Sequence, residues 1–193
     1  MRYCVFCGSA PGKDPKFLDA ARATGAALAA RGIGVVYGGG NVGLMGAVAD
    51  SALAGGGEVI GVIPVGLVRR EVAHRGLTRL DVVDTMHERK TRMHELSDGF
   101  LVLPGGYGTL DELFETLTWA QLGIHQKPTG LLSVSGYFAP LIGFLDGAVA
   151  GGLLKPEHRR LLLSATELVP LLDAMTGWKP PVDVIERWDP SKT

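Results

Sequence analysis

Residues 100–115 read FLVLPGGYGTLDELFE, and this stretch indicates the fold of the whole chain. The apolar residues 100–103 predict a short buried strand, which Pro104, Gly105 and Gly106 end. After them the apolar residues recur at helical spacing, at Leu110, Leu113, Phe114 and Leu117. A strand, a glycine turn and a helix in this order are typical of the anion-binding sites of α/β proteins.

Phosphate is the anion that this turn is expected to bind. Glycines let the backbone approach a ligand closely, the N–H groups of the first helical turn have no partner inside the helix, and Thr109 adds a hydroxyl. The same helix carries Asp111, Glu112 and Glu115 near its start. The helix dipole tolerates these carboxylates, but they repel a phosphate. They therefore indicate either chemistry on the rest of the ligand or an ordinary acidic first turn.

Composition narrows the class of protein. The chain has 193 residues, of which 46% are apolar and 7% aromatic, so one domain with a mainly aliphatic core is expected. Its 28 glycines are about twice the usual share and cluster at predicted strand ends. A formal net charge of −1 does not indicate binding to nucleic acid or to a membrane surface. No signal peptide or long apolar segment is found, and we expect a cytoplasmic protein.

The two cysteines form a C-x-x-C pattern, Cys4 and Cys7, in the first predicted strand. Residues three apart along a strand face opposite ways, with Cα atoms about 10 Å apart, which is beyond the reach of a disulfide. No second cysteine pair is present to complete a zinc site. We therefore expect two core cysteines.

Strands and helices alternate along the chain, which predicts an α/β fold: a doubly wound, Rossmann-like parallel sheet of about seven strands flanked by helices. The strands are expected at residues 2–6, 33–37, 58–63, 81–85, 100–103, 130–134 and 161–165. The helices are expected after Asp14-Pro15, at residues 42–54, from residue 86 onward, from residue 108 to about 122, and at residues 137–149 and 167–175. Residues 1–176 are expected to form one nucleotide-binding domain, followed by a C-terminal tail at 177–193.

The turn after the second strand contains G-x-G-x-x-G at Gly38, Gly40 and Gly43, the pattern of a dinucleotide fingerprint. The acid at the expected spacing, Glu58, opens the next strand, whereas a ribose-binding acid belongs at the end of that strand. NAD is therefore not favoured. We interpret this turn, including Gly39, as the glycine wall of a mononucleotide pocket, with close helix–strand packing as the alternative.

Several turns converge on one edge of the predicted sheet. Ligands of such sheets bind beyond the carboxyl ends of the strands, and Ser9, residues 38–43, residues 86–90 and residues 104–112 all belong there. At 86–90 the sequence MHERK starts a helix in which Met86 is expected to face inward. Its charged residues form either a solvated face or part of the site.

A phosphate cradle with nearby cations and one carboxylate is suited to a nucleoside 5′-monophosphate. Cleavage of the N-glycosidic bond passes through an oxocarbenium-like sugar, as in glycoside hydrolysis. A carboxylate can stabilise that positive charge, hold the ribose hydroxyls or deprotonate water. An arginine stays protonated and cannot act as a general acid, but it can bind an anion and favour departure of the base.

At these residues the chain resembles a known family. Residues 104–112 match P-G-G-x-G-T-x-x-E, and residues 86–90 match its upstream partner M-x-x-R-K. The chain is similar to the LONELY GUY (LOG) family of cytokinin riboside 5′-monophosphate phosphoribohydrolases, long mislabelled as lysine decarboxylases. The resemblance extends to about Leu172. One departure is Ala10, where many members carry a second serine.

The resemblance implies hydrolysis of N6-modified AMP to a free base and ribose 5-phosphate by a homodimer, with no metal and no cofactor. It assigns catalysis to Arg89 and Glu112. Thr118 is implied as a nucleotide contact by the resemblance alone, because it lies off the helical face of Glu112. The complete predicted substrate-binding set is Ser9, Gly39, Gly40, Glu71, Met86, Arg89, Lys90, Gly105, Gly106, Tyr107, Gly108, Thr109, Leu110, Asp111, Glu112 and Thr118.

Further expectations concern side chains around this set. Tyr107 and Trp119 are expected to pack rather than stack on a base, and the histidines are expected in surface or packing roles. Apolar surface from Leu117, Trp119 and Leu122 is expected to serve the implied dimer. Two alternatives are kept: a non-catalytic carrier of the same fold, such as the molybdenum cofactor carriers, and a general nucleotide nucleosidase indifferent to the N6 group.

Overall fold

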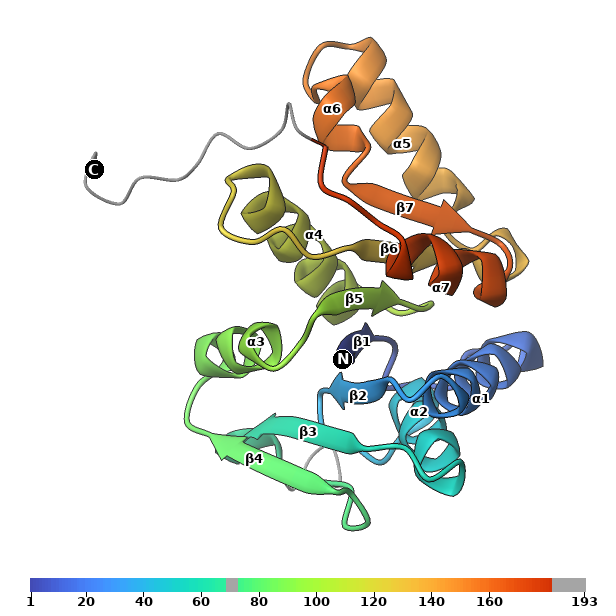
Figure 1. Ribbon diagram of the computed structural model, residues 1–193, viewed down its shortest axis with the longest axis vertical. Coiled ribbons are helices and arrows are strands. Elements are labelled where there is room, and N and C mark those ends of the chain that lie inside the picture. The colour runs from blue at the N-terminus through green and yellow to red at the C-terminus, as the bar shows by residue number, and fades with distance from the viewer. Residues whose placement is uncertain (69–72, 182–193) are drawn as a thin grey trace.

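A computed structural model describes residues 1–68 and 73–181 of the chain. Within these residues, seven strands form one parallel sheet in the order β4-β3-β2-β1-β5-β6-β7 (Figure 1). The strands are β1 Arg2–Phe6, β2 Gly34–Tyr37, β3 Val59–Pro64, β4 Arg79–Val83, β5 Gly99–Val102, β6 Thr129–Leu132 and β7 Leu162–Ala165. The predicted α/β, doubly wound sheet is confirmed.

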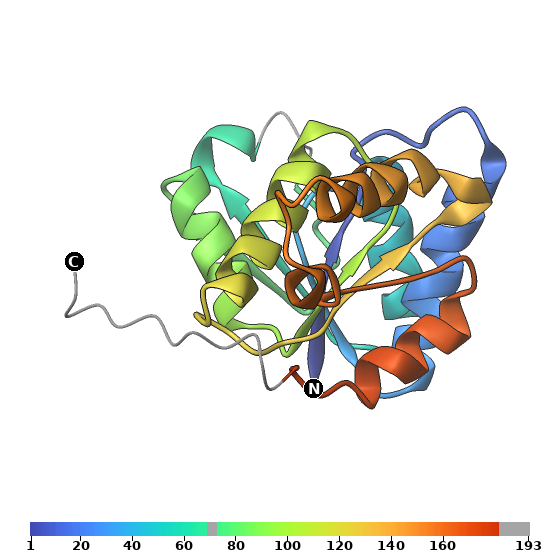
Figure 2. The same ribbon diagram turned by 90° about the horizontal axis from the view of Figure 1, so that it is seen from above.

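Helices cover both faces of the sheet (Figures 1 and 2). They are α1 Pro15–Ala30, α2 Gly43–Ala54, α3 Met86–Glu95, α4 Tyr107–Gln121, α5 Ala139–Ala150, the short α6 Pro156–Arg159 and α7 Leu168–Thr176. Two 3₁₀ turns, η1 Val65–Leu67 and η2 Val134–Gly136, follow β3 and β6. Helices α1, α2 and α7 pack on one face, and α3, α4 and α5 pack on the other.

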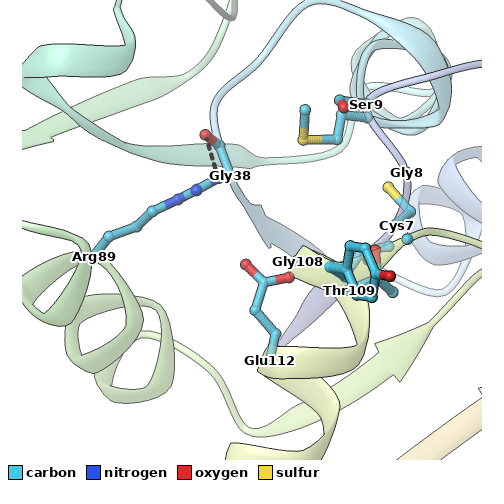
Figure 3. A pocket seen from close by; sticks show the side chains of 12 residues that line it. Cys7, Gly8, Ser9, Gly38, Arg89, Gly108, Thr109 and Glu112 are labelled. Carbon is cyan, nitrogen blue, oxygen red and sulfur yellow. Dashed lines mark hydrogen bonds between the residues drawn. The ribbon is translucent and has the colours of Figure 1, made fainter.

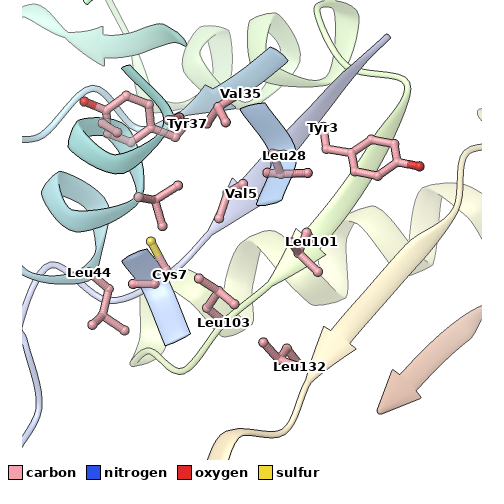
Figure 4. Packing of buried hydrophobic residues seen from close by; sticks show 14 of the residues in the cluster. Tyr3, Val5, Cys7, Leu28, Val35, Tyr37, Leu44, Leu101, Leu103 and Leu132 are labelled. Carbon is pink, nitrogen blue, oxygen red and sulfur yellow. The ribbon is translucent and has the colours of Figure 1, made fainter. Parts of the chain in front are cut away.

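Alternate residues of each strand enter the two cores. Figure 4 shows the core beneath α1, α2 and α7, where Tyr3, Val5 and Leu101 lie. Phe6 and Phe100, whose rings stack at 5.8 Å, belong to the opposite core. Cys7 lies in the first core and Cys4 in the second, and both are free thiols. The expected pair of core cysteines is confirmed.

The position of β1 determines where a ligand can bind. It pairs with β2 on one side and β5 on the other, and the order of the strands reverses at this point. Loops after β1 and β5 therefore diverge toward opposite faces and leave a crevice at the carboxyl edge, which is the usual binding site of open α/β sheets.

Two local predictions were wrong, and one short helix was missed. Strand β4 runs from Arg79 to Val83 instead of 81–85, because Thr85 caps α3 by accepting from the Glu88 N–H at 3.1 Å. Met86 does not face inward but is 42% exposed. Helix α6 was not expected, since four residues are too short to show a period.

The predicted tail begins with ordered packing. Trp178 packs against the cluster of Ala120 and Leu161, so the chain just beyond α7 still lies against α4 and the start of β7. Residues beyond 181 lie outside the described part, and the division at 176 stays a prediction. None of the helices among the described residues is long and apolar enough to span a membrane.

Candidate active site

Helix α4 begins with exposed main-chain amides at the carboxyl edge of the sheet. Gly106 is its N-cap and supplies no side-chain hydrogen bond, so the N–H groups of the first turn point outward without a capping side chain. Gly105 must lack a side chain, because a Cβ there would lie 2.1 Å from Thr109 Oγ1 and 2.9 Å from the Gly8 nitrogen. The result is a turn that fits an anion closely against backbone nitrogens.

Main-chain hydrogen bonds tie the neighbouring turns to this one. The Gly8 N–H donates to the Pro104 carbonyl at 3.0 Å, and the Leu44 N–H donates to the Gly8 carbonyl at 3.0 Å. The His74 N–H donates to the Gly39 carbonyl at 3.0 Å. The loops after β1, β2, β3 and β5 are thus joined into one surface by backbone groups.

A cavity of about 200 Å³ opens on this surface, between the loops after β1 and β5 (Figure 3). Seven residues of the predicted set line it: Ser9, Arg89, Gly106, Tyr107, Gly108, Thr109 and Glu112. The remaining lining residues are Val5, Cys7, Gly8, Gly38 and Met45. Turns far apart in the sequence therefore meet at one edge, as the sequence predicts.

Arg89 is buried, with 6% of its surface exposed, and its guanidinium is oriented by main-chain carbonyls. Its Nη2 donates to the Gly38 carbonyl (Figure 3) and its Nε to the Val62 carbonyl, both at 3.1 Å. Val62 lies within β3, and Gly38 directly follows β2. A Cβ on Gly38 would lie 2.0 Å from Nη2, so this glycine makes room for the guanidinium. The alternative of a solvated charged face is wrong for Arg89.

Glu112 lies one helical turn after Thr109, and its carboxylate points into the cavity on the side that faces Arg89 (Figure 3). Its charge also acts on the thiol behind the cavity. Burial, followed by the negative charge of Glu112, raises the pKa of Cys7 far above that of an ordinary thiol. Cys7 is therefore an apolar wall and not a nucleophile.

Several predicted contacts lie outside the cavity. Lys90 turns toward α4, where its Nζ lies 3.0 Å from both Asp111 Oδ2 and Glu115 Oε1. The Thr118 hydroxyl donates to the Phe114 carbonyl at 2.7 Å on an exposed part of α4. Their roles as substrate contacts stay predictions.

The other predicted residues are placed by the backbone around the site. Gly39 packs against β3, and Gly40 forms a bridge with Ala73. Gly105 faces a neighbouring, more apolar cavity of about 310 Å³. Leu110 packs partly into the core, and Met86 lies at the start of α3. Glu71 falls outside the described residues.

Aromatic and sulfur-containing side chains around the cavity differ from expectation. Tyr107 is 95% exposed at the cavity rim, so the prediction that it packs is wrong, because the first turn of α4 projects beyond the sheet. Met45 was missed as a lining residue. The signal was available: it lies in the first turn of the helix that follows the glycine wall.

Three of the five histidines, His74, His94 and His125, have structural partners, and His87 is exposed. His94 lies 4.5 Å from the Trp119 ring and within 3.0 Å of Thr116 Oγ1, which confirms a packing role for both rings. His74 Nε2 lies 2.8 Å from Asp50 Oδ1. Within the described ranges, no group of three or more His, Cys, Asp or Glu residues is arranged to hold a metal ion. That the reaction needs no metal stays a prediction.

The fold and cavity define an α/β protein in which an uncapped helix start and a carboxylate line one cavity at the carboxyl edge of the sheet. A family model described as "Possible lysine decarboxylase" matches residues 45–175. A cytokinin riboside 5′-monophosphate phosphoribohydrolase of Oryza sativa subsp. japonica, LOG, is 47% identical over 97% of this chain and 78% of its own length. Another of that description, LOG7 of Arabidopsis thaliana, is 47% identical over 97% of this chain and 88% of its own length. The chain belongs to the LONELY GUY (LOG) family.

Solved structures share the fold at lower identity. The molybdenum cofactor carrier protein of Chlamydomonas reinhardtii has a TM-score of 0.67 and 20% identity, covering 91% of this chain and 94% of its own. The molybdenum cofactor binding protein of Rippkaea orientalis has a TM-score of 0.65 and 20% identity, covering 91% of this chain and 96% of its own. At this identity the similarity concerns the fold alone.

Proposed function

We propose that this protein hydrolyses the N-glycosidic bond of adenosine 5′-monophosphate carrying an N6 substituent, the substrate class of the phosphoribohydrolases that it resembles. The observation that carries the proposal is that Arg89 and the Glu112 carboxylate line the same cavity as the uncapped start of α4. The products are the free base and ribose 5-phosphate.

In this proposal the phosphate binds the first-turn amides of α4, with the hydroxyls of Thr109 and Ser9 beside it. The ribose then extends from the cradle toward Glu112. As the C1′–N bond breaks, positive charge develops on the sugar and the bonding electrons leave with the base, which takes up a proton from solvent. Glu112 stabilises that charge and accepts a proton from the water that adds to C1′. Arg89 remains protonated and stabilises negative charge.

The enzyme is favoured over the carrier. The close relatives are named as phosphoribohydrolases at 46–50% identity, whereas the carriers share only the fold at 20% identity. A carrier of an anionic pterin also gains nothing from a carboxylate in the binding cavity. Purification of the protein with a bound pterin chromophore would favour the carrier instead.

A product assay tests the proposal. AMP, N6-isopentenyl-AMP, GMP, CMP and adenosine are supplied separately, and free base and ribose 5-phosphate are quantified by chromatography. We expect base release from adenine monophosphates and none from adenosine, which lacks the phosphate. Equal rates with all four monophosphates would indicate the general nucleosidase. Absence of any release by the wild-type protein would remove the proposal.

We further propose a cytoplasmic homodimer. Phe114, Leu122 and Ile124, on and after α4, are 38%, 37% and 50% exposed, and they leave apolar surface along α4 and just beyond its end. Light scattering should give twice the 20.4 kDa of one chain at micromolar concentration. A monomer would contradict the dimer while leaving the hydrolysis untouched.

A further inference from the structure

Helices α3 and α4 carry the two candidate catalytic side chains and are joined by an ion cluster next to them. Lys90 directly follows Arg89 on α3, and Asp111 directly precedes Glu112 on α4. The Lys90 Nζ lies 3.0 Å from Asp111 Oδ2 and 3.0 Å from Glu115 Oε1. The Lys90 side chain is 11% exposed and that of Glu115 is 23% exposed, so the contact is largely shielded from water.

The charges of this cluster depend on one another. Glu115 Oε2 is buried and has no hydrogen-bond partner, so the nearby ammonium is what compensates this carboxylate. Burial, the largest single influence, lowers the pKa of Lys90. The hydrogen bonds and charges of Glu115 and Asp111 together outweigh it, and the pKa of Lys90 is raised. Removal of either partner therefore leaves a charge in a poorly solvated position.

The cluster also closes a narrow internal space between the helices. This space does not admit a water molecule, and its walls include Lys90, Met93, Glu112 and Glu115. One turn further along α3, the contact between His94 Nε2 and Thr116 Oγ1 at 3.0 Å joins the helices again. The side chain of Glu112 thus borders the same internal space that the Lys90 ion cluster closes.

We propose that Lys90 and Glu115 are positioning residues, whose ion pair holds α3 and α4 at the spacing that lets Arg89 and Glu112 act on the same substrate. Lys90 is then not a ligand of the substrate phosphate. Two of its three N–H donors are directed at carboxylates, and it does not line the cavity. This proposal rests on the proposed function.

The two roles of Lys90 predict different kinetics. For the variants Lys90→Met and Glu115→Gln, we expect kcat to fall about 10- to 100-fold each, because small shifts of catalytic groups have effects of this size. KM for N6-isopentenyl-AMP should change less than about threefold. The double variant Lys90→Met/Glu115→Gln should lose no more than the worse single variant, since both changes break one link. It leaves no buried charge without its partner, because the remaining carboxylate of the cluster, Asp111, is 58% exposed. It therefore tests the proposal if a single variant fails to fold.

A phosphate ligand would behave otherwise. If Lys90→Met raises KM tenfold or more at unchanged kcat while Glu115→Gln is neutral, the proposal is overturned. Titration calorimetry with AMP gives the same distinction without turnover: retained affinity in Lys90→Met supports positioning, and a tenfold loss overturns it. A wild-type protein that binds AMP but releases no base would contradict the proposed function, while this comparison of affinities still decides the role of Lys90.

Arg92→Met is the matched control. Arg92 lies on the same helix, but its guanidinium bonds Asp81 on β4 at 3.0 Å, away from α4. We expect wild-type kcat and KM for this variant. A loss equal to that of Lys90→Met would show that any weakened ion pair on α3 has the same effect, and it would overturn the specific role of the Lys90 cluster.

Discussion

Glycine-lined cavities open at both edges of the sheet, and they differ in what surrounds them. The cavity at the amino edge, near Gly34 and Gly57, is the larger, at about 380 Å³ against about 200 Å³ at the carboxyl edge. Its arginine, Arg2, is held by both oxygens of Glu58 at 2.7 and 3.1 Å. Helices α1 and α2 end there and present carbonyls.

At the carboxyl edge the polarity is reversed. Helix α4 starts there with uncapped amides, and Arg89 is oriented by neutral carbonyls. The positive end of the helix dipole points into the smaller cavity. Glycine content and volume therefore do not identify a binding site in this fold. The direction of the helices and the groups that orient the charges are what favour the carboxyl edge as the candidate site.

The largest difference in activity between the two edges should come from replacing one carboxylate by an amide at each edge. Glu112→Gln removes the group that faces the proposed sugar, and we expect the rate of base release to fall about 100- to 10,000-fold. Glu58→Gln removes one partner of a pair that is 40% exposed on each side, so activity should be unchanged and stability should fall by less than about 1 kcal/mol. Steady-state assays and urea denaturation measure both. Unchanged activity in Glu112→Gln would remove the assigned mechanism.

A smaller difference in activity between the edges should come from adding one methyl group at each edge. Gly105→Ala places a Cβ against Thr109 and the backbone of Gly8, so the cradle must distort. We expect phosphate affinity and kcat/KM to fall about tenfold or more. The new methyl of Gly34→Ala meets the movable side chains of Glu58 and Arg2, 2.9 and 3.1 Å away, and activity should be retained. Equal losses in the two variants would contradict the special role of the carboxyl edge.

The smallest effect concerns acid stability near the amino ends of the strands. Burial is the main cause that lowers the pKa of His94 to about 3 and that of His125 to about 4, from 6.5. The folded protein keeps both neutral while the unfolded chain binds protons. Their stability contribution is intact above pH 6.5 and is lost as the pH falls toward 4. We expect a loss on the order of 1 kcal/mol per histidine at pH 5.

Urea midpoints at pH 7.5 and pH 5 check this prediction. His94→Gln should be less stable than the wild type at pH 7.5, because it loses its aromatic contacts, but its midpoint should fall less on acidification. A fall equal to that of the wild type would show that His94 does not contribute to acid sensitivity.

The sequence predicts the part of the molecule that depends on local pattern. The alternation of strands and helices, the convergence of the turns at Gly38 and Gly105, and the position of Glu112 follow from periodicity and from the parallel sheet. The opposite faces of Cys4 and Cys7 follow from strand geometry.

Side-chain direction at the surface of the helices was not predictable from the same pattern. Arg89 and Lys90 are adjacent in one charged run, yet one enters the cavity and the other joins α4. Tyr107 projects from the first turn of α4 because nothing covers it within the described chain. These outcomes depend on the distance between elements far apart in sequence, which no local pattern contains.

The floor of the candidate site is assembled from peptide groups, through the bonds of Gly8 with Pro104 and Leu44 and of His74 with Gly39. Most side-chain substitutions leave these backbone groups in place. In the proposed function, the affinity for a phosphate and the selectivity for the group attached to it therefore depend on different parts of the site. If the proposed function holds, changes at lining positions such as the buried Met45 and the exposed Tyr107 are expected to alter which nucleotide is accepted while the backbone of the site is kept. A protein made in this way can acquire a new substrate in few mutational steps.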